Sequence, residues 1–234
     1  MPNKYLIGID IGGTKTRGIL LDGRKIIGTL EIPTPKNKEG LKRELKKIVK
    51  KLKPEKRNFS IGIGVAGIIK KTTLLFAPNI GIRNFNFKKF FSGIPLKIDN
   101  DARSFLRGEI LLGIAKGAEN AFGFTIGTGI GRAYARKGVV KKIKKFEYPE
   151  KWEKEYQKIR DQKNDLKLIK FLGVKLSNLL KQYRAETIII GGGLIEQKDF
   201  FNKLTKELRK QGIKSKIKPS NLGRNSAAIG ATLI

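Results

Sequence analysis

The chain contains no cysteine and no histidine, and it has a single tryptophan and a single methionine. Without cysteine there are no disulfides and no thiolate metal ligands, and without histidine there are no imidazole ligands. Every catalytic triad that relies on a histidine base is also excluded. Proton transfer, if the protein is an enzyme, therefore depends on carboxylates, lysine or tyrosine.

Long apolar runs are missing as well. No stretch of about 18 apolar residues is present, and no signal-peptide pattern precedes the first predicted strand, so we expect a cytoplasmic protein without a membrane partner. The 234 residues, of which 39% are hydrophobic, suffice for one large domain or two small lobes.

Acidic residues are scarce relative to basic ones, and the formal net charge is +31. The basic residues concentrate in 36–57 and 136–170, where glutamates and aspartates are interspersed and lysine outnumbers arginine. We interpret both stretches mainly as solvated helix faces, because nucleic-acid recognition favours arginine and interleaved aromatics. Nonspecific binding of polyanions remains an expectation, and a biological nucleic-acid role stays open.

The stretch 5–22, YLIGIDIGGTKTRGILLD, contains the most informative pattern. Two apolar runs flank Gly12-Gly13-Thr14, which predicts a strand, a tight turn and a second strand. Glycines allow backbone N–H groups to approach an anion, and Thr14 and Lys15 add a hydroxyl and a cation. Asp10 lies just before this turn, where a cation such as Mg²⁺ would offset its repulsion from phosphate. A glycine-rich hairpin without function is the alternative.

The remainder of the first half alternates predicted strands and helices. We expect a strand over 25–31, a helix over 41–52, a strand over 59–65, a loop at Ala77-Pro78-Asn79, a short strand over 96–98 and a helix over 102–116. Asp99-Asn100-Asp101 lies at the last strand-to-helix junction, where polar side chains can reach a small molecule. Asp101 is a candidate base or, alternatively, a helix N-cap ahead of Ala102.

The second half repeats the opening pattern. A strand over 121–126 enters a second glycine turn at 127–131, and a strand follows over 132–136. We assign no secondary structure to the charged segment 141–163. Beyond it we expect, in order, a helix over 166–183, a strand over 187–190, a helix ending at Gly212, a strand over 213–217 and a helix over 226–234. Two such halves predict a cleft with one phosphate turn on either wall, able to bind a nucleotide.

Seven motifs in order resemble those of the ROK family of sugar kinases: GIDIGGTKTRGILLD, GIGVAGII, APNIG, KIDNDARSFLRGE, FTIGTGIG, TIIIGGG and AAIGA. The BadF-like N-acetylglucosamine kinases share the first and fourth, but GTGIG and AAIGA fit ROK better. The resemblance implies an α/β, two-lobed actin-like ATPase (ribonuclease H-like) fold with an interlobe cleft. The implied lobes are 1–117, with the helix 226–234 packing near it, and 118–225.

The resemblance also implies roles for particular residues. It places Asp10, Gly12, Gly13, Thr14 and Lys15 at the phosphates of ATP, with Asp10 toward Mg²⁺. It assigns Gly127, Thr128 and Gly129 to the second phosphate loop, and Gly191, Gly192 and Gly193 to the adenosine motif. Asn79 and Asn100 match sugar-binding positions, and Asp101 matches the catalytic base.

The chain also departs from the family. Its zinc motif of histidine and cysteines is missing, so no structural zinc is expected. The GEIGH element is missing too; Glu147 in FEYPE falls near its place, although a surface role for Glu147 is the other interpretation. Arg132 and Ala66 replace a usual glycine and a usual proline.

The main hypothesis is a glucokinase-like, ATP- and Mg²⁺-dependent kinase that phosphorylates a hexose or amino sugar. Whether the chain forms a homodimer, as many relatives of the family do, stays open. One alternative is an ATP-binding protein with altered or lost catalysis. The other alternative is a nucleic-acid-associated protein. Against it, we expect no helix-turn-helix of the kind that family repressors carry, because the first phosphate turn comes so early in the sequence.

Overall fold

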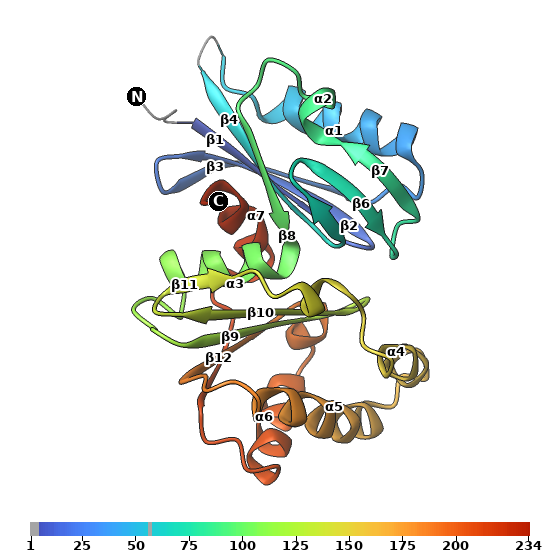
Figure 1. Ribbon diagram of the computed structural model, residues 1–234, viewed down its shortest axis with the longest axis vertical. Coiled ribbons are helices and arrows are strands. Elements are labelled where there is room, and N and C mark those ends of the chain that lie inside the picture. Colours follow the sequence, from blue (N-terminus) through green and yellow to red (C-terminus); the bar gives the residue numbers. More distant parts are fainter. Residues whose placement is uncertain (1–4, 56–57) are drawn as a thin grey trace. The chain divides into compact units, whose positions relative to one another are not determined.

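The computed structural model describes residues 5–55 and 58–234 of the chain. The end of the first basic stretch, at positions 56 and 57, lies outside this range. The chain forms two compact units, the first comprising Met1–Gly108 and Arg224–Ile234 and the second Glu109–Gly223. Figure 1 shows the elements of each unit. None of the helices in the described part is both long enough and apolar enough to cross a membrane.

The first unit is built on a five-stranded sheet with the order β3-β2-β1-β4-β8. Its strands are β1 (Tyr5–Ile11), β2 (Lys15–Asp22), β3 (Lys25–Pro33), β4 (Phe59–Val65) and β8 (Leu96–Asn100). A small antiparallel sheet contains β5 (Ile68–Lys70), β6 (Thr73–Ala77) and β7 (Ile82–Asn86). The helices are α1 (Lys38–Leu52), α2 (Phe87–Phe90), α3 (Asp101–Leu111) and, after the short 3₁₀ helix η3 (Gly223–Asn225), α7 (Ser226–Thr232).

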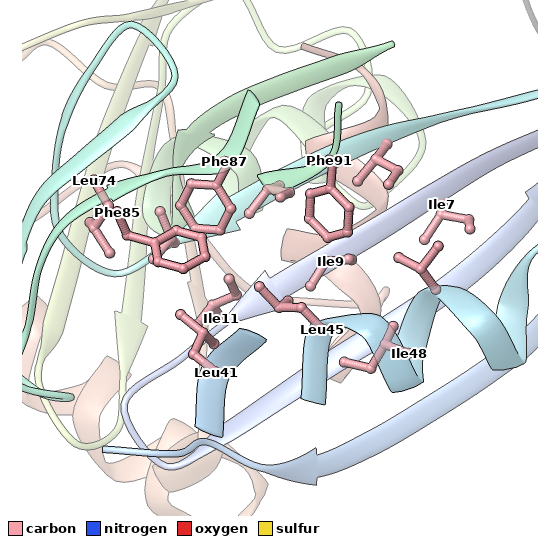
Figure 2. Packing of buried hydrophobic residues seen from close by; sticks show 14 of the residues in the cluster. Ile7, Ile9, Ile11, Leu41, Leu45, Ile48, Leu74, Phe85, Phe87 and Phe91 are labelled. Atoms are coloured by element: carbon pink, nitrogen blue, oxygen red, sulfur yellow. The ribbon is translucent and has the colours of Figure 1, made fainter. Parts of the chain in front are cut away.

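The two faces of this sheet are covered by different elements. Because side chains alternate along a strand, Ile7, Ile9 and Ile11 point to one face, where they pack with Leu45 of α1 and with Phe87 (Figure 2). The other face carries Gly8 and Asp10, and α7 packs there directly on β1 and β4. The predicted apolar face of α1 is confirmed, since its apolar residues are all buried.

The second unit repeats the topology of the first. Its sheet has the order β11-β10-β9-β12-β13, with strands β9 (Ala121–Ile126), β10 (Ile130–Arg136), β11 (Val139–Lys141), β12 (Thr187–Gly191) and β13 (Lys216–Pro219). The helices are η1 (Lys144–Glu147), α4 (Glu153–Asp161), α5 (Asp165–Leu180), η2 (Gly193–Glu196) and α6 (Phe200–Lys210). In both sheets three antiparallel strands from one meander are followed by two strands added in parallel.

Several local predictions differ from the structure. The helix predicted over 102–116 ends at Leu111 as α3, and the strand predicted over 213–217 lies at Lys216–Pro219 as β13. The strand predicted over 25–31 continues as β3 to Pro33, and a proline is tolerated there because β3 lies at the edge of the sheet. The segment 141–163, which the sequence left unassigned, contains η1 and the regular helix α4.

Candidate active site

The first glycine turn joins β1 to β2 and is held from two sides. The N–H of Gly12 donates to the carbonyl of Lys15 at 3.1 Å. The ammonium of Lys36 donates to the carbonyl of Gly13 and, at 2.8 Å, to the carbonyl of Asn79. One lysine that sequence reasoning missed therefore connects the predicted phosphate turn to the loop that carries a predicted sugar residue.

Lys15 and Thr14, both predicted to meet phosphate, already have partners in the first unit. The ammonium of Lys15 lies 2.6 Å from the carboxylate of Glu31, and the guanidinium of Arg17 lies 2.5 Å from it. The hydrogen bond from Lys15 is the largest cause that lowers the pKa of Glu31. The carbonyl of Thr14 accepts from the N–H of Thr34 at 2.8 Å. A phosphate bound here would compete with Glu31 for the Lys15 ammonium.

Asp10 carries a carboxylate in an unusual environment. Its Oδ1 is buried, and no donor in the described part of the chain hydrogen-bonds to it. Burial, followed by the charge of Asp101, raises the pKa of Asp10 from 3.8 to about 8, while Arg17 lowers it. A buried carboxylate oxygen without a donor fits a bound cation, which would supply the missing charge.

Asp101 lies next to Asp10 across a glycine. In the parallel pairing of β1 with β4, Asp10 is opposite Gly64. The position of a Cβ on Gly64 would be 3.6 Å from the Cα of Asp101. Burial raises the pKa of Asp101 to about 6 against the opposing effect of the N–H of Ala102. Two neighbouring carboxylates with different pKa values are typical of acid–base and metal chemistry.

Asn100, not the aspartate that follows it, supplies the capping oxygen of α3. Its Oδ1 accepts from the N–H of Ala102 at 3.0 Å and from the N–H of Arg103 at 3.3 Å. The carboxylate of Asp99 pairs with Arg103 and Arg107, each at 2.6 Å. Both lone pairs of the Asn100 oxygen are thus used, so a sugar hydroxyl could meet only its NH₂ group as a donor.

The second unit brings two other predicted glycine turns together. Gly127–Gly129 joins β9 to β10, and its first N–H donates to its last carbonyl at 3.0 Å. Gly191–Gly193 begins at the last residue of β12. Gly192 has φ +98°, and a Cβ there would lie 2.5 Å from the carbonyl oxygen of Ile126. The amide nitrogen of Gly193 is 4.0 Å from the Cβ position of the first glycine of the other turn. At Gly192 only glycine permits both the positive φ and the close approach to Ile126.

Glu147, the candidate substitute for the GEIGH glutamate, ends the 3₁₀ helix η1 of the second unit. It is half-buried and follows the buried Phe146, whose ring lies 5.4 Å from that of Tyr183. A sugar-binding role for Glu147 stays a prediction.

Sequence reasoning also missed a group of residues around α4. Arg132 is 2% exposed and lies 3.0 Å from the carboxylate of Glu153, while Tyr156 and Arg160 bind carbonyls of the second glycine turn. An arginine at a position where the family motif predicted glycine was a visible signal, but its burial and its partner were not.

The raised pKa of Asp10 predicts a stability that falls as the pH rises. The folded state holds this proton up to about pH 8, whereas the unfolded chain releases it near pH 3.8. Between pH 6 and pH 8 the folded state therefore binds more protons, and its free energy of unfolding falls by about 2–3 kcal/mol. Asp101, with a pKa of about 6, contributes mainly below this range. We expect Asp10→Asn to remove most of this decline when the free energy of unfolding is measured by urea titration at pH 6, 7 and 8.

Glu39→Gln is the matched control for this measurement, because it removes an exposed carboxylate from α1 in the same unit. The free energy of unfolding of this control should fall with pH as steeply as that of the parent protein. The absence of histidine and cysteine removes the side chains that commonly titrate at these pH values. If the free energy of unfolding of Asp10→Asn fell with pH as steeply as that of the parent, the proton uptake assigned to Asp10 would be contradicted.

The two sheets, each a three-stranded meander extended by two parallel strands, define a protein with the actin-like ATPase fold. The ROK family profile matches residues 6–142, and the chain belongs to the ROK family. A glucokinase of Streptomyces coelicolor is 34% identical over 131 residues, which cover 53% of this chain but only 41% of that protein. A xylose repressor of Bacillus spizizenii is 25% identical over 98% of this chain and 76% of its own length.

Solved structures show the same fold. The ROK family glucokinase from Streptomyces griseus in complex with glucose and AMPPNP superposes with a TM-score of 0.85, at 22% identity, over 97% of this chain and 98% of that one. The inorganic polyphosphate/ATP-glucomannokinase from an Arthrobacter strain gives a TM-score of 0.81 at 24% identity, covering 99% and 98% of the two chains.

Proposed function

We propose that the protein is an ATP-dependent sugar kinase that transfers the γ-phosphate to a hydroxyl of a hexose or amino sugar. The observation that carries this proposal is the pair Asp10 and Asp101, adjacent across Gly64 and with pKa values raised to about 8 and about 6. Family membership and the glucokinase relatives support it.

Asp101 is the proposed general base. A sugar hydroxyl becomes a competent nucleophile when a carboxylate takes its proton as it attacks the γ-phosphorus, and the carboxylate is most effective when its pKa is near the working pH. A pKa of about 6 leaves Asp101 mainly ionised at neutral pH. The two capping hydrogen bonds that Oδ1 of Asn100 accepts fix the start of α3 and thereby the backbone of Asp101.

The residues fit a magnesium ion on the phosphate side of this pair. The described residues hold no group of three or more carboxylates that could bind a metal by themselves. Mg²⁺ commonly needs only one or two carboxylates and takes its other ligands from phosphates and water. When bound, it would neutralise charge on the transferring phosphate, and Asp10 would hold it through the Oδ1 that lacks a donor.

The glycine turns are the proposed nucleotide contacts. In the first unit Gly12, Gly13, Thr14 and Lys15 would meet the terminal phosphates. In the second unit Gly127–Gly129 would bind phosphate through backbone N–H groups, and Gly191–Gly193 would lie against adenosine. The proposed sugar contacts are Asn79, the NH₂ group of Asn100, and Glu147.

A coupled assay of ADP release over a panel of hexoses and amino sugars tests the proposal. We expect turnover that depends on ATP, Mg²⁺ and one class of sugar. Nucleotide binding without turnover on any sugar would contradict the kinase and favour an ATP-binding protein with altered catalysis.

A second candidate function, the binding of a polyanion, is favoured by the net charge of +31 and by the xylose repressor relative. Sequence-specific retardation of DNA at physiological salt would support it. Retardation that vanishes with added salt and shows no sequence preference would instead show that the binding is nonspecific charge attraction.

A further inference from the structure

The helix α4, within the segment that the sequence left unassigned, presents one polar face to the second glycine turn. Glu153, Tyr156 and Arg160 are spaced three and four residues apart, so they lie on the same side of the helix. Each of them contacts a backbone group between positions 127 and 130. The helix therefore contacts the full length of the turn.

Two of these side chains bind the carbonyl oxygens of the turn. The hydroxyl of Tyr156 donates to the carbonyl of Gly127 at 2.5 Å. The guanidinium of Arg160 donates from Nη1 to the carbonyl of Gly127 at 3.1 Å and to that of Thr128 at 2.6 Å. The other side of that guanidinium is held by Asp161, at 2.9 Å from Nε and 2.7 Å from Nη2.

These contacts decide where the N–H groups of the turn point. In a trans peptide the carbonyl of one residue and the N–H of the next point in opposite directions, and the chain has no cis peptide among its described residues. Fixing the carbonyls of Gly127 and Thr128 toward α4 thus aims the N–H groups of Thr128 and Gly129 away from it. Successive N–H groups that point the same way form an anion-binding concavity.

The start of α4 is anchored by a buried ion pair. The carboxylate of Glu153 accepts from the N–H of Glu150 at 2.9 Å and from the N–H of Ile130 at 3.4 Å, and lies 3.0 Å from Arg132. The guanidinium of Arg132 also donates to the carbonyl of Tyr148 at 2.6 Å. Arg132 thereby ties β10 to the helix that holds the turn.

We propose that Tyr156 and Arg160 are positioning residues for nucleotide phosphate, which act by presenting the N–H groups of Thr128 and Gly129 to it. This inference rests on the proposed function, because it requires that the second glycine turn bind phosphate. It assigns to α4 a role in nucleotide affinity and none in sugar recognition.

The test compares Tyr156→Phe, Arg160→Met and Arg160→Lys with the parent protein by calorimetric titration of ADP and by steady-state kinetics. We expect the dissociation constant of ADP and the KM for ATP to rise about tenfold in Arg160→Met and about threefold in Tyr156→Phe. Arg160→Lys, which can still donate to one carbonyl, should recover part of the loss. The KM for sugar should not change.

Lys158→Met is the matched control, since it removes one positive charge from an exposed position of the same helix. It should leave the dissociation constant of ADP within twofold of the parent value. Equal effects of Lys158→Met and Arg160→Met would overturn the inference, because net charge alone would then explain them. A rise of the sugar KM equal to that of the ATP KM would overturn it too, as the sign of a general loss of structure.

Failure of the inference differs from failure of the proposed function. A parent protein that binds ADP and phosphorylates sugar, with Tyr156→Phe and Arg160→Met unchanged, overturns the inference and leaves the kinase intact. A parent protein that binds no nucleotide at the concentrations of ATP in cells overturns both.

Discussion

Asp101→Asn should reduce the kcat for sugar phosphorylation by about 10²–10⁴-fold, because the amide cannot accept the proton of the attacking hydroxyl. The KM for ATP should change little, since the proposed phosphate contacts lie on other residues. The capping oxygen of α3 belongs to Asn100 and stays in place in the variant. The measurement is steady-state kinetics on the best sugar of the panel.

The stability of this variant separates catalysis from folding. Asp101 is a desolvated carboxylate with a raised pKa, so its neutral replacement should be at least as stable as the parent above pH 6. The exposed Glu39→Gln serves as the control and should retain full activity. A kcat for Asp101→Asn within about threefold of the parent value would contradict the role of Asp101 as the base.

Gly62→Ala should destabilise the first unit by about 3 kcal/mol or more, because the added methyl group would overlap backbone atoms. A Cβ on Gly62 would lie 2.0 Å from the carbonyl oxygen of Ala231 in α7 and 2.4 Å from its carbonyl carbon. Backbone atoms cannot rotate away as a side chain can. The helix would have to leave β4, and its buried small residues would lose their contacts.

Gly28→Ala in β3 of the same sheet is the matched control for Gly62→Ala. Its Cβ would lie 3.2 Å from the end of the flexible Leu52 side chain, which can move. Chemical unfolding should therefore show a loss of less than about 1 kcal/mol for Gly28→Ala. Equal losses in the two variants would show that α7 does not pack on the sheet as tightly as described.

The sequence predicted best where local chemistry decides the structure. The glycine turn at Gly12 lies between two apolar runs, and the apolar spacing in α1 faces the core, so both could be predicted. The repeat of a strand, a glycine turn and a strand in the second half was visible for the same reason, whereas the third strand of that meander, β11, was not predicted. These features depend on neighbours in the sequence and need no distant contact.

The sequence could not predict which long-range partners the polar groups choose. The pairing of Lys15 with Glu31 and the bridge from Lys36 to Asn79 join residues far apart in the chain. The helix α4 was hidden because its buried face includes Glu153 beside Tyr156, so its apolar period is broken by a charge. That charge is tolerated inside because it pairs with buried Arg132.

The most direct test of the central claim is phosphorus NMR of the parent protein with ATP, Mg²⁺ and a sugar of the active class. The account predicts a new phosphomonoester signal that grows in step with ADP and is nearly absent with Asp101→Asn. Release of inorganic phosphate in place of a sugar phosphate, or an equal phosphomonoester signal from Asp101→Asn, would contradict it.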